Sequence, residues 1–553
     1  MTLWDVTGHG SLHPNTRALD HQGRHDPLGR FAHLLPECGL KVGILTDLSQ
    51  RTLLREWLGR LSKSTIDLVL PPYSDPTGYA SEGIRCHLAA GYLQVQERLR
   101  TVGPHDVIID LRDRRDIVRA RVWRSMFLDL RPGGLYIVDR RTARRPDPRL
   151  ATWLDSLDAR RSDDREYLDA VEDIAVNRQV VILTKRGVHL PKLTSAKVNG
   201  ILPKRDGGVQ LRLLSALDAG TFSPSSRDFS GAVGAAFGED VTYPRIYLRC
   251  YAGDVVWSPP GLIMANYCVL PGSTGVDPAS MTRNQPPQAG FVRVEEIQPT
   301  NEISGVAYSV DVPPGLDIAR TVSEVASRLW GWDIAKARFP DLKAVYTSRG
   351  LEHDDLLIAM LTAYGIDPSE IVGVQECVKV EALISADAVW GDGADTFAHP
   401  EVKIPWHRIS AGLADRSGPG SPPRHKRVLI NPRASGQPES VIQLLQANGF
   451  AVIVPEECAL PELAAVVRQA EVVAGRGMSA MTAFMPDCPQ TYVVVGSDPL
   501  GHRRATIHAA LAGGAVHHLG HTTAPGQADT ASERDEADQL VLERELSDVL
   551  QLL

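Results

Sequence analysis

The sequence lacks several features that would place it in a specialised class. No apolar run reaches 18 residues, and the first 26 residues have no apolar core, so we expect neither a membrane span nor a signal peptide. The net charge of −8 gives no general attraction to nucleic acid. The seven cysteines are scattered, with no CxxC pair, which favours reduced thiols in the cytoplasm over a disulfide framework or a zinc site.

Catalytic signatures are missing as well. There is no GxSxG, Walker A or HExxH pattern, and the histidines within residues 501–521 have irregular spacing. We therefore expect no metal, and a helix followed by a strand is the better interpretation of that His-rich segment.

What the chain does contain is alternation of apolar runs and helical patterns. At 553 residues it is long enough for two to four domains. We predict an N-terminal arm over residues 1–35 and a Rossmann-like α/β domain over residues 36–190. Within this domain the predicted strands are 40–45, 66–72, 105–111 and 133–140, the predicted helices are 52–61, 80–101 and 116–129, and residues 166–186 add one more helix and strand.

The remaining sequence divides into three parts. Residues 191–415 begin with short β-type runs and continue with βα alternation, including a helix over 317–332. A Gly/Pro/Ser-rich linker opens a second βα series, which we assign to a lobe over 416–520. Residues 521–553 are predicted to be a flexible tail that ends in a docking helix.

Residues 106–140 resemble the later half of a class I S-adenosylmethionine-dependent methyltransferase. Asp110 ends a predicted strand, Arg131-Pro132-Gly133-Gly134 turns into the next strand, and Asp139 follows. The resemblance implies a Rossmann-like fold. The cofactor half departs from the family, because Gly43 lies inside its strand and the turn after the strand has no glycine. The next strand ends in Pro71-Pro72 and reaches Asp75 only later, so we expect no working S-adenosylmethionine site. Asp110 and Asp113 remain either metal ligands or a solvated charge cluster.

Two later segments, 312–332 and 427–484, carry a second resemblance. The family pattern is a GH-x-x-x-E-x-x-x-R-x-W helix, a strand ending in Ser-Arg, a GF-x-x-x-x-PE segment and a Gly-Ser turn. In order and spacing the chain is similar to glycosyltransferase family 61, found in capsular and cell-surface polysaccharide enzymes, over about residues 230–515. This resemblance implies a two-lobed, Rossmann-like GT-B fold. It also implies a nucleotide-sugar donor, which is a substrate rather than a resident cofactor.

The donor site implied by this resemblance lies in the C-terminal lobe. Arg433, just after the RVLIN strand, would neutralise the diphosphate, and an ordinary surface arginine is the alternative. Glu456 is assigned to the ribose or base, whereas Glu457 is favoured as a helix start. The phosphate-turn candidates implied by the resemblance are Gly475, Gly477 and Ser479, with Thr482 in place of a family histidine.

The catalytic assignment is open because the family's Gly-His pair falls on Ala319-Arg320. Arginine stays protonated, so Arg320 occupies the position of the expected base but cannot serve as one. Glu324 and Asp317 are candidate replacements, and Glu324 would alternatively brace Arg328 one turn further on. Further candidates are His353, Asp354 and Asp355, for which a solvated helix start is the alternative.

Two hypotheses follow, with a weaker third. The first is a glycosyltransferase that moves a sugar from a nucleotide donor to a surface or capsular glycan acceptor. The second is a non-catalytic scaffold that acts through a partner protein or through homo-oligomer assembly. Methyl transfer is the third. The sequence does not identify the donor sugar, the acceptor or the linkage.

Overall fold

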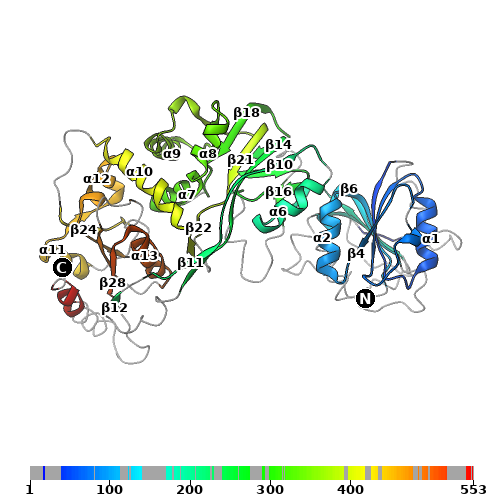
Figure 1. Cartoon of the computed structure of the whole chain (residues 1–553), viewed down its shortest axis with the longest axis horizontal. Coiled ribbons are helices and arrows are strands. Elements are labelled where there is room, and N and C mark those ends of the chain that lie inside the picture. Colours follow the sequence, from blue (N-terminus) through cyan, green and yellow to red (C-terminus); the bar gives the residue numbers. More distant parts are fainter. Residues whose placement is uncertain are drawn as a thin grey trace.

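A computed structural model of the chain shows three α/β units (Figure 1). We call them the N-terminal unit (β1 and residues 39–185), the middle unit (188–417) and the C-terminal unit (425–519 and 543–549). The structure describes residues 16–18, 39–79, 81–112, 123, 126–139, 170–176, 180–186, 188–205, 207–224, 227–228, 240–259, 261–273, 289–292, 298–313, 316, 318–391, 396–417, 425–433, 439–476, 484, 489–495, 499–519, 543–549 and 551.

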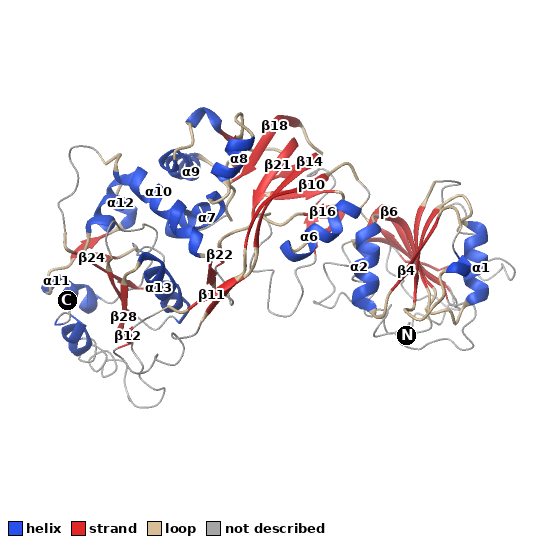
Figure 2. Ribbon diagram, viewed as in Figure 1, coloured by secondary structure: helices blue, strands red, loops and turns tan. Residues whose placement is uncertain are grey.

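The N-terminal unit is an eight-stranded sheet in the order β1-β7-β8-β6-β5-β2-β3-β4. From β4 to β6 all neighbours are parallel, whereas β8 is antiparallel to both β6 and β7. Helices α1 (Arg51–Arg60) and α2 (Tyr92–Val102) cover opposite faces, as Figure 2 shows, because each buries an apolar stripe against the sheet. The strands are β1 (Thr16–Ala18), β2 (Lys41–Leu45), β3 (Thr65–Leu70), β4 (Ile84–Leu88), β5 (His105–Asp110), β6 (Leu130–Asp139), β7 (Val171–Val176) and β8 (Val180–Lys185).

Three expectations for this unit are corrected. The predicted helix over 80–101 is a strand, β4, followed by the shorter helix α2. Residues 171–185 form two antiparallel strands rather than a helix and a strand, because Val171–Val176 pairs with Val180–Lys185. The predicted N-terminal arm contributes β1, which pairs in parallel with β7. Most of the helix predicted near 116–129 lies outside the described residues.

The middle unit has a mixed sheet in the order β16-β15-β14-β21-β18-β19-β20, with β10 also paired to β14. The four strands from β21 to β20 are parallel to one another, and β14 is antiparallel to β21. The predicted helix 317–332 is divided into α7 (Ile318–Leu329) and α8 (Trp332–Arg338). The other elements are β9 (Val188–Pro191), α6 (Ser195–Ile201), β10 (Gln210–Leu217), β11 (Gly220–Phe222), β13 (Val241–Tyr243), β14 (Ile246–Ser258), β15 (Leu262–Ala265), β16 (Cys268–Val269), β17 (Ala289–Val292), β18 (Asn301–Ser309), β19 (Lys343–Thr347), α9 (Leu351–Tyr364), β20 (Ile371–Val374), β21 (Val378–Ala386), β22 (Trp390–Gly391), β23 (Phe397–Ala398) and α10 (Lys403–Ala414).

The C-terminal unit is a six-stranded parallel sheet in the order β12-β28-β27-β26-β24-β25. Its edge strand β12 (Arg227–Asp228) comes from far upstream in the sequence. Residues 543–549 are helical, and Leu546 and Val549 are buried with the apolar residues of this unit, in the stretch where we expected a docking helix. The other elements are β24 (Arg427–Ile430), α11 (Glu439–Ala447), β25 (Ala451–Ile453), α12 (Leu460–Gln469), β26 (Val472–Arg476), β27 (Thr491–Val495), α13 (Pro499–Ala512) and β28 (Ala515–Leu519).

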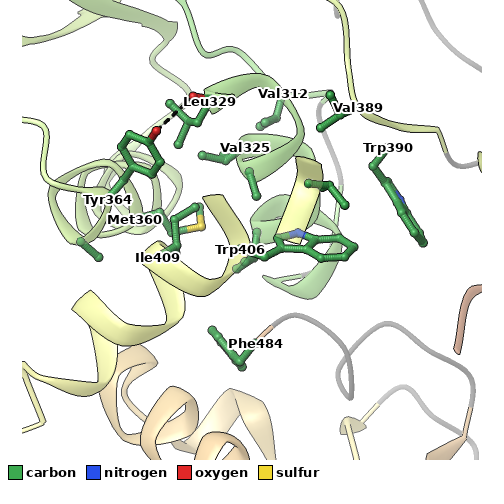
Figure 3. Packing of buried hydrophobic residues seen from close by; sticks show 14 of the residues in the cluster. Val312, Val325, Leu329, Met360, Tyr364, Val389, Trp390, Trp406, Ile409 and Phe484 are labelled. Atoms are coloured by element: carbon green, nitrogen blue, oxygen red, sulfur yellow. Dashed lines mark hydrogen bonds between the residues drawn. The ribbon is translucent and has the colours of Figure 1, made fainter. Parts of the chain in front are cut away.

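One hydrophobic core joins the middle and C-terminal units. Helix α10 packs against α7 and α9 on one side and against α12 on the other. Figure 3 shows Trp406 and Ile409 of α10 between the side chains of α7 and α9 and Phe484 of the C-terminal unit. Trp406 also contacts the rings of Trp390 and His508. These two units therefore share buried apolar surface, which favours a fixed arrangement between them.

The N-terminal and middle units meet through a buried polar contact centred on Arg205. Its guanidinium donates to the backbone oxygen of Arg100, to Oδ1 of Asp129 at 3.1 Å and to the backbone oxygen of Asn266 at 2.7 Å. Asn266 and Tyr267 form the two-residue turn between β15 and β16, and both have positive φ (47° and 57°), which suits the right-handed twist of a hairpin. The turn thereby presents backbone oxygens to a guanidinium at the boundary between the units.

Candidate functional site

The N-terminal unit has a topological switch point between β2 and β5. Counting from β2, its first five strands have the doubly wound order 3-2-1-4-5, and ligands of such sheets bind at the carboxyl ends of the strands on either side of the switch. Asp110, the last residue of β5, accepts two hydrogen bonds from Arg112, at 2.9 and 2.7 Å, and one from Tyr136 at 3.2 Å. Asp110 is 1% exposed and Arg112 5% exposed, so this position is filled by an internal ion pair.

Electrostatics hold this pair in its charged form. Burial alone would lower the pKa of the Arg112 guanidinium, but the adjacent Asp110 carboxylate outweighs burial and raises it. Asp110 therefore already has a fixed counterion. Asp113, the other acid considered as a metal ligand, lies outside the described residues.

The turn after β2 has no glycine and closes through side chains instead. Leu48 adopts φ of 66°, and its N–H donates to Oγ1 of Thr46 at 3.0 Å. Gly43, inside β2, faces α2: a Cβ there would lie 3.0 Å from Cδ2 of Leu99 and 3.5 Å from the ring of His105. Gly43 thus allows close packing between helix and sheet rather than close approach of a ligand. The exposed Asp75 accepts hydrogen bonds from Thr77 in its own turn.

The C-terminal unit has a second switch point, between β24 and β26. Counting from β24, its five strands have the order 2-1-3-4-5, for which the ligand crevice lies between the first and third strands of the series, here β24 and β26. Arg433 stands three residues after the end of β24, and Gly475 in β26 pairs with Ile430. The structure therefore brings Arg433 and Gly475 to neighbouring strands at the same edge.

Two glutamates accompany Arg433 at this edge. The carboxylate of Glu456 accepts the backbone N–H of Arg433, at 3.2 and 3.3 Å, and Oε1 of Glu457 accepts from its guanidinium at 3.0 Å. Both acids lie in a short 3-10 turn, Pro455–Glu457, which follows β25. Glu456 thus fixes the backbone of the loop that carries Arg433. The Arg433 side chain is 70% exposed and that of Glu457 58% exposed, so their ion pair is weak and open to exchange.

The residues predicted for the phosphate turn fall into two groups. Gly477, Ser479 and Thr482 lie outside the described residues. Gly475 lies within β26, so its N–H and C=O face neighbouring strands of the ladder.

In the middle unit, helix α7 carries two of the predicted catalytic residues. Glu324 is partly buried, and its Oε2 lies 3.9 Å from Nη2 of Arg328, one turn further on. Arg320 is exposed. Asp317 lies outside the described residues.

At the carboxyl ends of β18 and β19 lies a polar cluster of which the sequence reasoning named His353 and Asp354 but missed Asp311 and Arg349. Asp311, 1% exposed, accepts from the N–H of Thr347 and from its hydroxyl, both at 3.0 Å, and Arg349 lies 3.4 Å from the same carboxylate. Nη1 of Arg349 lies 3.2 Å from Nε2 of His353. Because a guanidinium only donates, Nε2 of His353 accepts and carries no proton in this arrangement. Burial, followed by the charge of Arg349, lowers the pKa of His353.

The acids next to His353 have different environments. Asp354 accepts from the hydroxyl of Ser348 at 2.6 Å and from the N–H of Arg349 at 3.1 Å, so it closes the start of α9. Asp355 is exposed. The signal for this cluster is the Ser348-Arg349 pair after the strand KAVYT, because polar residues at the carboxyl end of a parallel strand face the ligand edge.

A second buried cluster was missed in the N-terminal unit. Asp67, inside β3, accepts from Arg85 of β4 and contacts His87 of β4 and His105 of β5. Burial favours a higher pKa for Asp67, but the hydrogen bonds from His105 and His87 prevail and lower it. The signal is a charged residue inside the apolar run IDLVL, which requires a buried partner.

No group of three or more His, Cys, Asp or Glu side chains among the described residues is arranged to hold a metal ion. None of the described helices is long and apolar enough to cross a membrane.

Comparisons with known proteins give methyltransferases among the solved structures. The MycE methyltransferase of mycinamycin biosynthesis, with Mg and SAH, is 18% identical over 29% of this chain and 47% of its own, with a TM-score of 0.24. Human methyltransferase-like protein 13, with SAH, is 21% identical over 28% of this chain and 74% of its own, with a TM-score of 0.21. The antibiotic-resistance methyltransferase Kmr gives 17% identity, 29% and 93% coverage, and a TM-score of 0.19.

The match spans less than half of MycE. At these identities and TM-scores the likeness decides nothing about activity, and the strand order itself supports a Rossmann-like N-terminal unit. No protein-family model and no curated protein matches the sequence.

Proposed function

We propose that the protein is a glycosyltransferase that binds a nucleotide-sugar donor in its C-terminal unit and transfers the sugar to a glycan acceptor. The observation that supports it most directly is the position of Arg433 at the switch point of a 2-1-3-4-5 parallel sheet. An exposed guanidinium there can bind a diphosphate with two parallel hydrogen bonds.

Glu456 fixes the backbone of this arginine, and Glu457 is an ion-pair partner that a ligand can replace. Glu456 accepts from the Arg433 backbone N–H, so the backbone at Arg433 is fixed before a ligand arrives. The exposed pair with Glu457 costs little to exchange for a phosphate, because solvent screens it. A bound diphosphate would therefore replace Glu457 rather than break a buried contact.

Glu324 is the side chain we propose as the base that accepts the acceptor's proton. Of the two carboxylates predicted as replacements for the base within residues 317–332, it is the one among the described residues, and it is partly buried, 3.9 Å from Arg328. A base has to be within hydrogen-bond reach of the acceptor hydroxyl in the productive complex. Such catalytic hydrogen bonds shorten when the substrate binds.

We propose that the N-terminal unit does not use S-adenosylmethionine. The buried Asp110–Arg112 pair occupies the switch point, and Gly43 is used for helix packing. Neither feature fits a cofactor that needs a glycine turn and a free carboxylate. This unit then serves as a docking element, through contacts such as those of Arg205.

Binding of nucleoside diphosphates and sugar nucleotides tests the proposal. The melting temperature is measured across a panel of these ligands at millimolar concentration, where 100 times the dissociation constant adds about 2.7 kcal/mol. Arg433→Ala should weaken the best ligand at least tenfold, because a hydrogen bond to a charged group contributes about 1.5–3 kcal/mol. Arg408→Ala is the matched control, since Arg408 is also exposed and ion-paired, with Asp333, but lies on α10.

Turnover distinguishes the catalytic proposal from the scaffold. Donor hydrolysis or transfer that is lost in Glu324→Gln, with donor affinity unchanged, supports the glycosyltransferase. Donor binding without turnover, together with a stable complex or self-assembly on purification, supports the scaffold. If no nucleotide binds at millimolar concentration, the donor site in the C-terminal unit is wrong.

A further inference from the structure

The last turn of α7 lies at a third switch point, that of the middle unit. Counting from β18, its four parallel strands have the order 3-2-1-4, so the switch lies between β18 and β21. Two contacts fix the turn there. The hydroxyl of Tyr308 in β18 donates to the backbone oxygen of Arg328, and Nε1 of Trp330 donates to the backbone oxygen of Asp387, just after β21. Arg328 is thereby anchored where a sheet of this order binds ligands.

The Arg328 guanidinium is buried but poorly satisfied. Arg328 is 8% exposed, and Nε has no hydrogen-bond partner among the residues that the structure describes. Nη1 lies at 3.5 Å from the backbone oxygen of Gly272, and Nη2 lies at 3.9 Å from Glu324, which is beyond hydrogen-bond distance. A guanidinium has five N–H donors, and leaving them unused in a buried position costs free energy.

Three other buried arginines are better satisfied. Arg249 donates through Nε, Nη1 and Nη2 to Asn199, Asp387 and Ser195, at 2.7–2.9 Å. Arg112 is bidentate with Asp110, and Arg205 is bound to a carboxylate and to backbone oxygens. Arg328 is buried like these three, but its guanidinium contacts are longer and its Nε is unpaired among the described residues.

A second cation lies close to Arg328. Lys192 is backbone-paired with Val269, three residues before Gly272, whose carbonyl faces Arg328. Burial and then the positive charge of Arg328 lower the pKa of Lys192, as expected for two cations brought together. No hydrogen bond or ion pair joins the Lys192 ammonium to another described side chain, and Glu324 is the carboxylate found beside Arg328. This region therefore combines two positive charges, Arg328 and Lys192, with the one carboxylate found beside Arg328.

We propose that Arg328 and Lys192 form an oxyanion site that binds a phosphate, sulfate or carboxylate group of a substrate. The oxyanion would accept hydrogen bonds from Nε and one Nη of Arg328 in the bidentate geometry, and from the Lys192 ammonium. It would thereby be the partner that these donors lack. Ser385 and Gly272 lie next to this position: Gly272 has φ of +90°, and a side chain there would meet Ser385 and the guanidinium. The absence of a Cβ makes room for the Ser385 hydroxyl beside Arg328.

The site is separate from the donor site and does not rest on the proposed function. Only the assignment of this site to the acceptor rests on the proposed function. If Glu324 is the base, an anionic group bound by Arg328 would position a glycan hydroxyl beside that carboxylate. The acceptor would then be an acidic or phosphorylated sugar rather than a neutral one.

Inorganic phosphate tests the site in the full-length Arg433→Ala variant, in which the C-terminal arginine can no longer bind it. Phosphate affinity is measured from ³¹P line broadening and from the melting temperature. We expect this background variant to bind phosphate, Arg328→Gln in the same background to weaken binding at least tenfold, and Arg328→Lys to be intermediate. Arg408→Gln in the same background is the matched control and should leave phosphate affinity unchanged.

Lys192→Gln is a second variant on a different element, and it decides the matter if Arg328→Gln does not fold. It should weaken phosphate severalfold, with no loss of nucleotide affinity in a chain that retains Arg433. Phosphate binding that is abolished by Arg433→Ala alone, or unaffected by both Arg328→Gln and Lys192→Gln, overturns the oxyanion site. Loss of nucleotide binding with phosphate binding retained would overturn the donor site and leave this one standing.

Discussion

Three arginines near the carboxyl ends of parallel strands have three different environments, and the environment decides what each side chain can do. Arg112 is buried and bidentate with Asp110. Arg433 is exposed, with a screened partner that a ligand can replace. Arg328 is buried and loosely held, so its donors remain available. Burial and partnership, rather than residue type, separate a structural arginine from a binding one.

Arg112→Met should destabilise the N-terminal unit by about 3–5 kcal/mol, because it leaves the Asp110 carboxylate buried without its counterion. The measurement is denaturant unfolding of the full chain. The double variant Asp110→Leu/Arg112→Met should lose less than the sum of the two single variants, since no charge is then left buried.

Arg60→Ala provides the control, because Arg60 and Glu56 form an exposed pair at 3.5 Å, where a change within about 0.5 kcal/mol is expected. A loss below about 1 kcal/mol for Arg112→Met would show that the pair does not fill the switch point as a buried unit.

Residue patterns predicted part of the candidate sites. The sequence RVLINPR placed Arg433 after a strand, because a short apolar run followed by polar residues is typical of a parallel strand and its carboxyl end. The partner of Arg112 was not predicted from the sequence, and the environment of Arg328 was predicted only in part. Pairing of Arg112 with Asp110 depends on the path of the chain after β5, and the Arg328 environment depends on Gly272 and Lys192, which are distant in sequence.

At the scale of elements, helix α10 carries the contact between two units. Gly412 of α10 lies against the backbone of Ala363 in α9, so that a Cβ would overlap with that carbonyl oxygen. Gly59, near the end of α1, has open space where a Cβ would be. The same residue type thus has a packing role in one helix and none in the other.

Gly412→Ala should lower stability by about 1–3 kcal/mol, because overpacking at the α9–α10 contact exceeds the gain in helix propensity. Gly59→Ala should instead raise stability by about 0.5–1 kcal/mol, since nothing opposes that gain. Denaturant midpoints of the two variants, compared with the parent chain, check both signs. Stabilisation by Gly412→Ala would contradict the close contact.

Element prediction failed where local pattern and tertiary pairing disagree. We did not predict α10; its Pro405 lies in the first turn, where a helix tolerates it. Strand β4 was included in a predicted helix although its residues alternate between apolar and polar, and its pairing with β3 decides its conformation. Strand β7 depends in the same way on its antiparallel partner β8.

At the scale of the whole molecule, two different kinds of contact join the three units. The middle and C-terminal units share a hydrophobic core around α10. The N-terminal and middle units meet through the buried Arg205, Asp129 and the β15–β16 turn, with Lys185 donating to the nearby backbone oxygens of Leu128 and Leu130. Burial lowers the pKa of Lys185 to about 7. A polar contact of this kind is specific, but it is sensitive to loss of one partner.

Arg205→Met should weaken the contact between these units by about 3–5 kcal/mol, because the buried Asp129 loses one of the two arginines with which it forms ion pairs. Hydrogen exchange should then become faster by about two orders of magnitude or more at the β15–β16 turn and at the end of α2, with no change in α9. Arg245→Ala is the control, because its pair with Asp218 is exposed and 3.7 Å long. Unchanged exchange in Arg205→Met would show that other contacts hold the units together.

The sequence by itself determined the class of the molecule: an α/β chain with βα alternation in several segments and no membrane-length apolar run. Periodicity and composition are local properties, so they are visible in the chain before it folds. The strand orders, and with them three switch points, were decided by tertiary structure. Tertiary structure also decided which polar side chains have hydrogen-bond or ion-pair partners, because burial and pairing join residues far apart in sequence. Asp110 is thereby neutralised by Arg112, while Arg433 and Arg328 keep donors for a ligand.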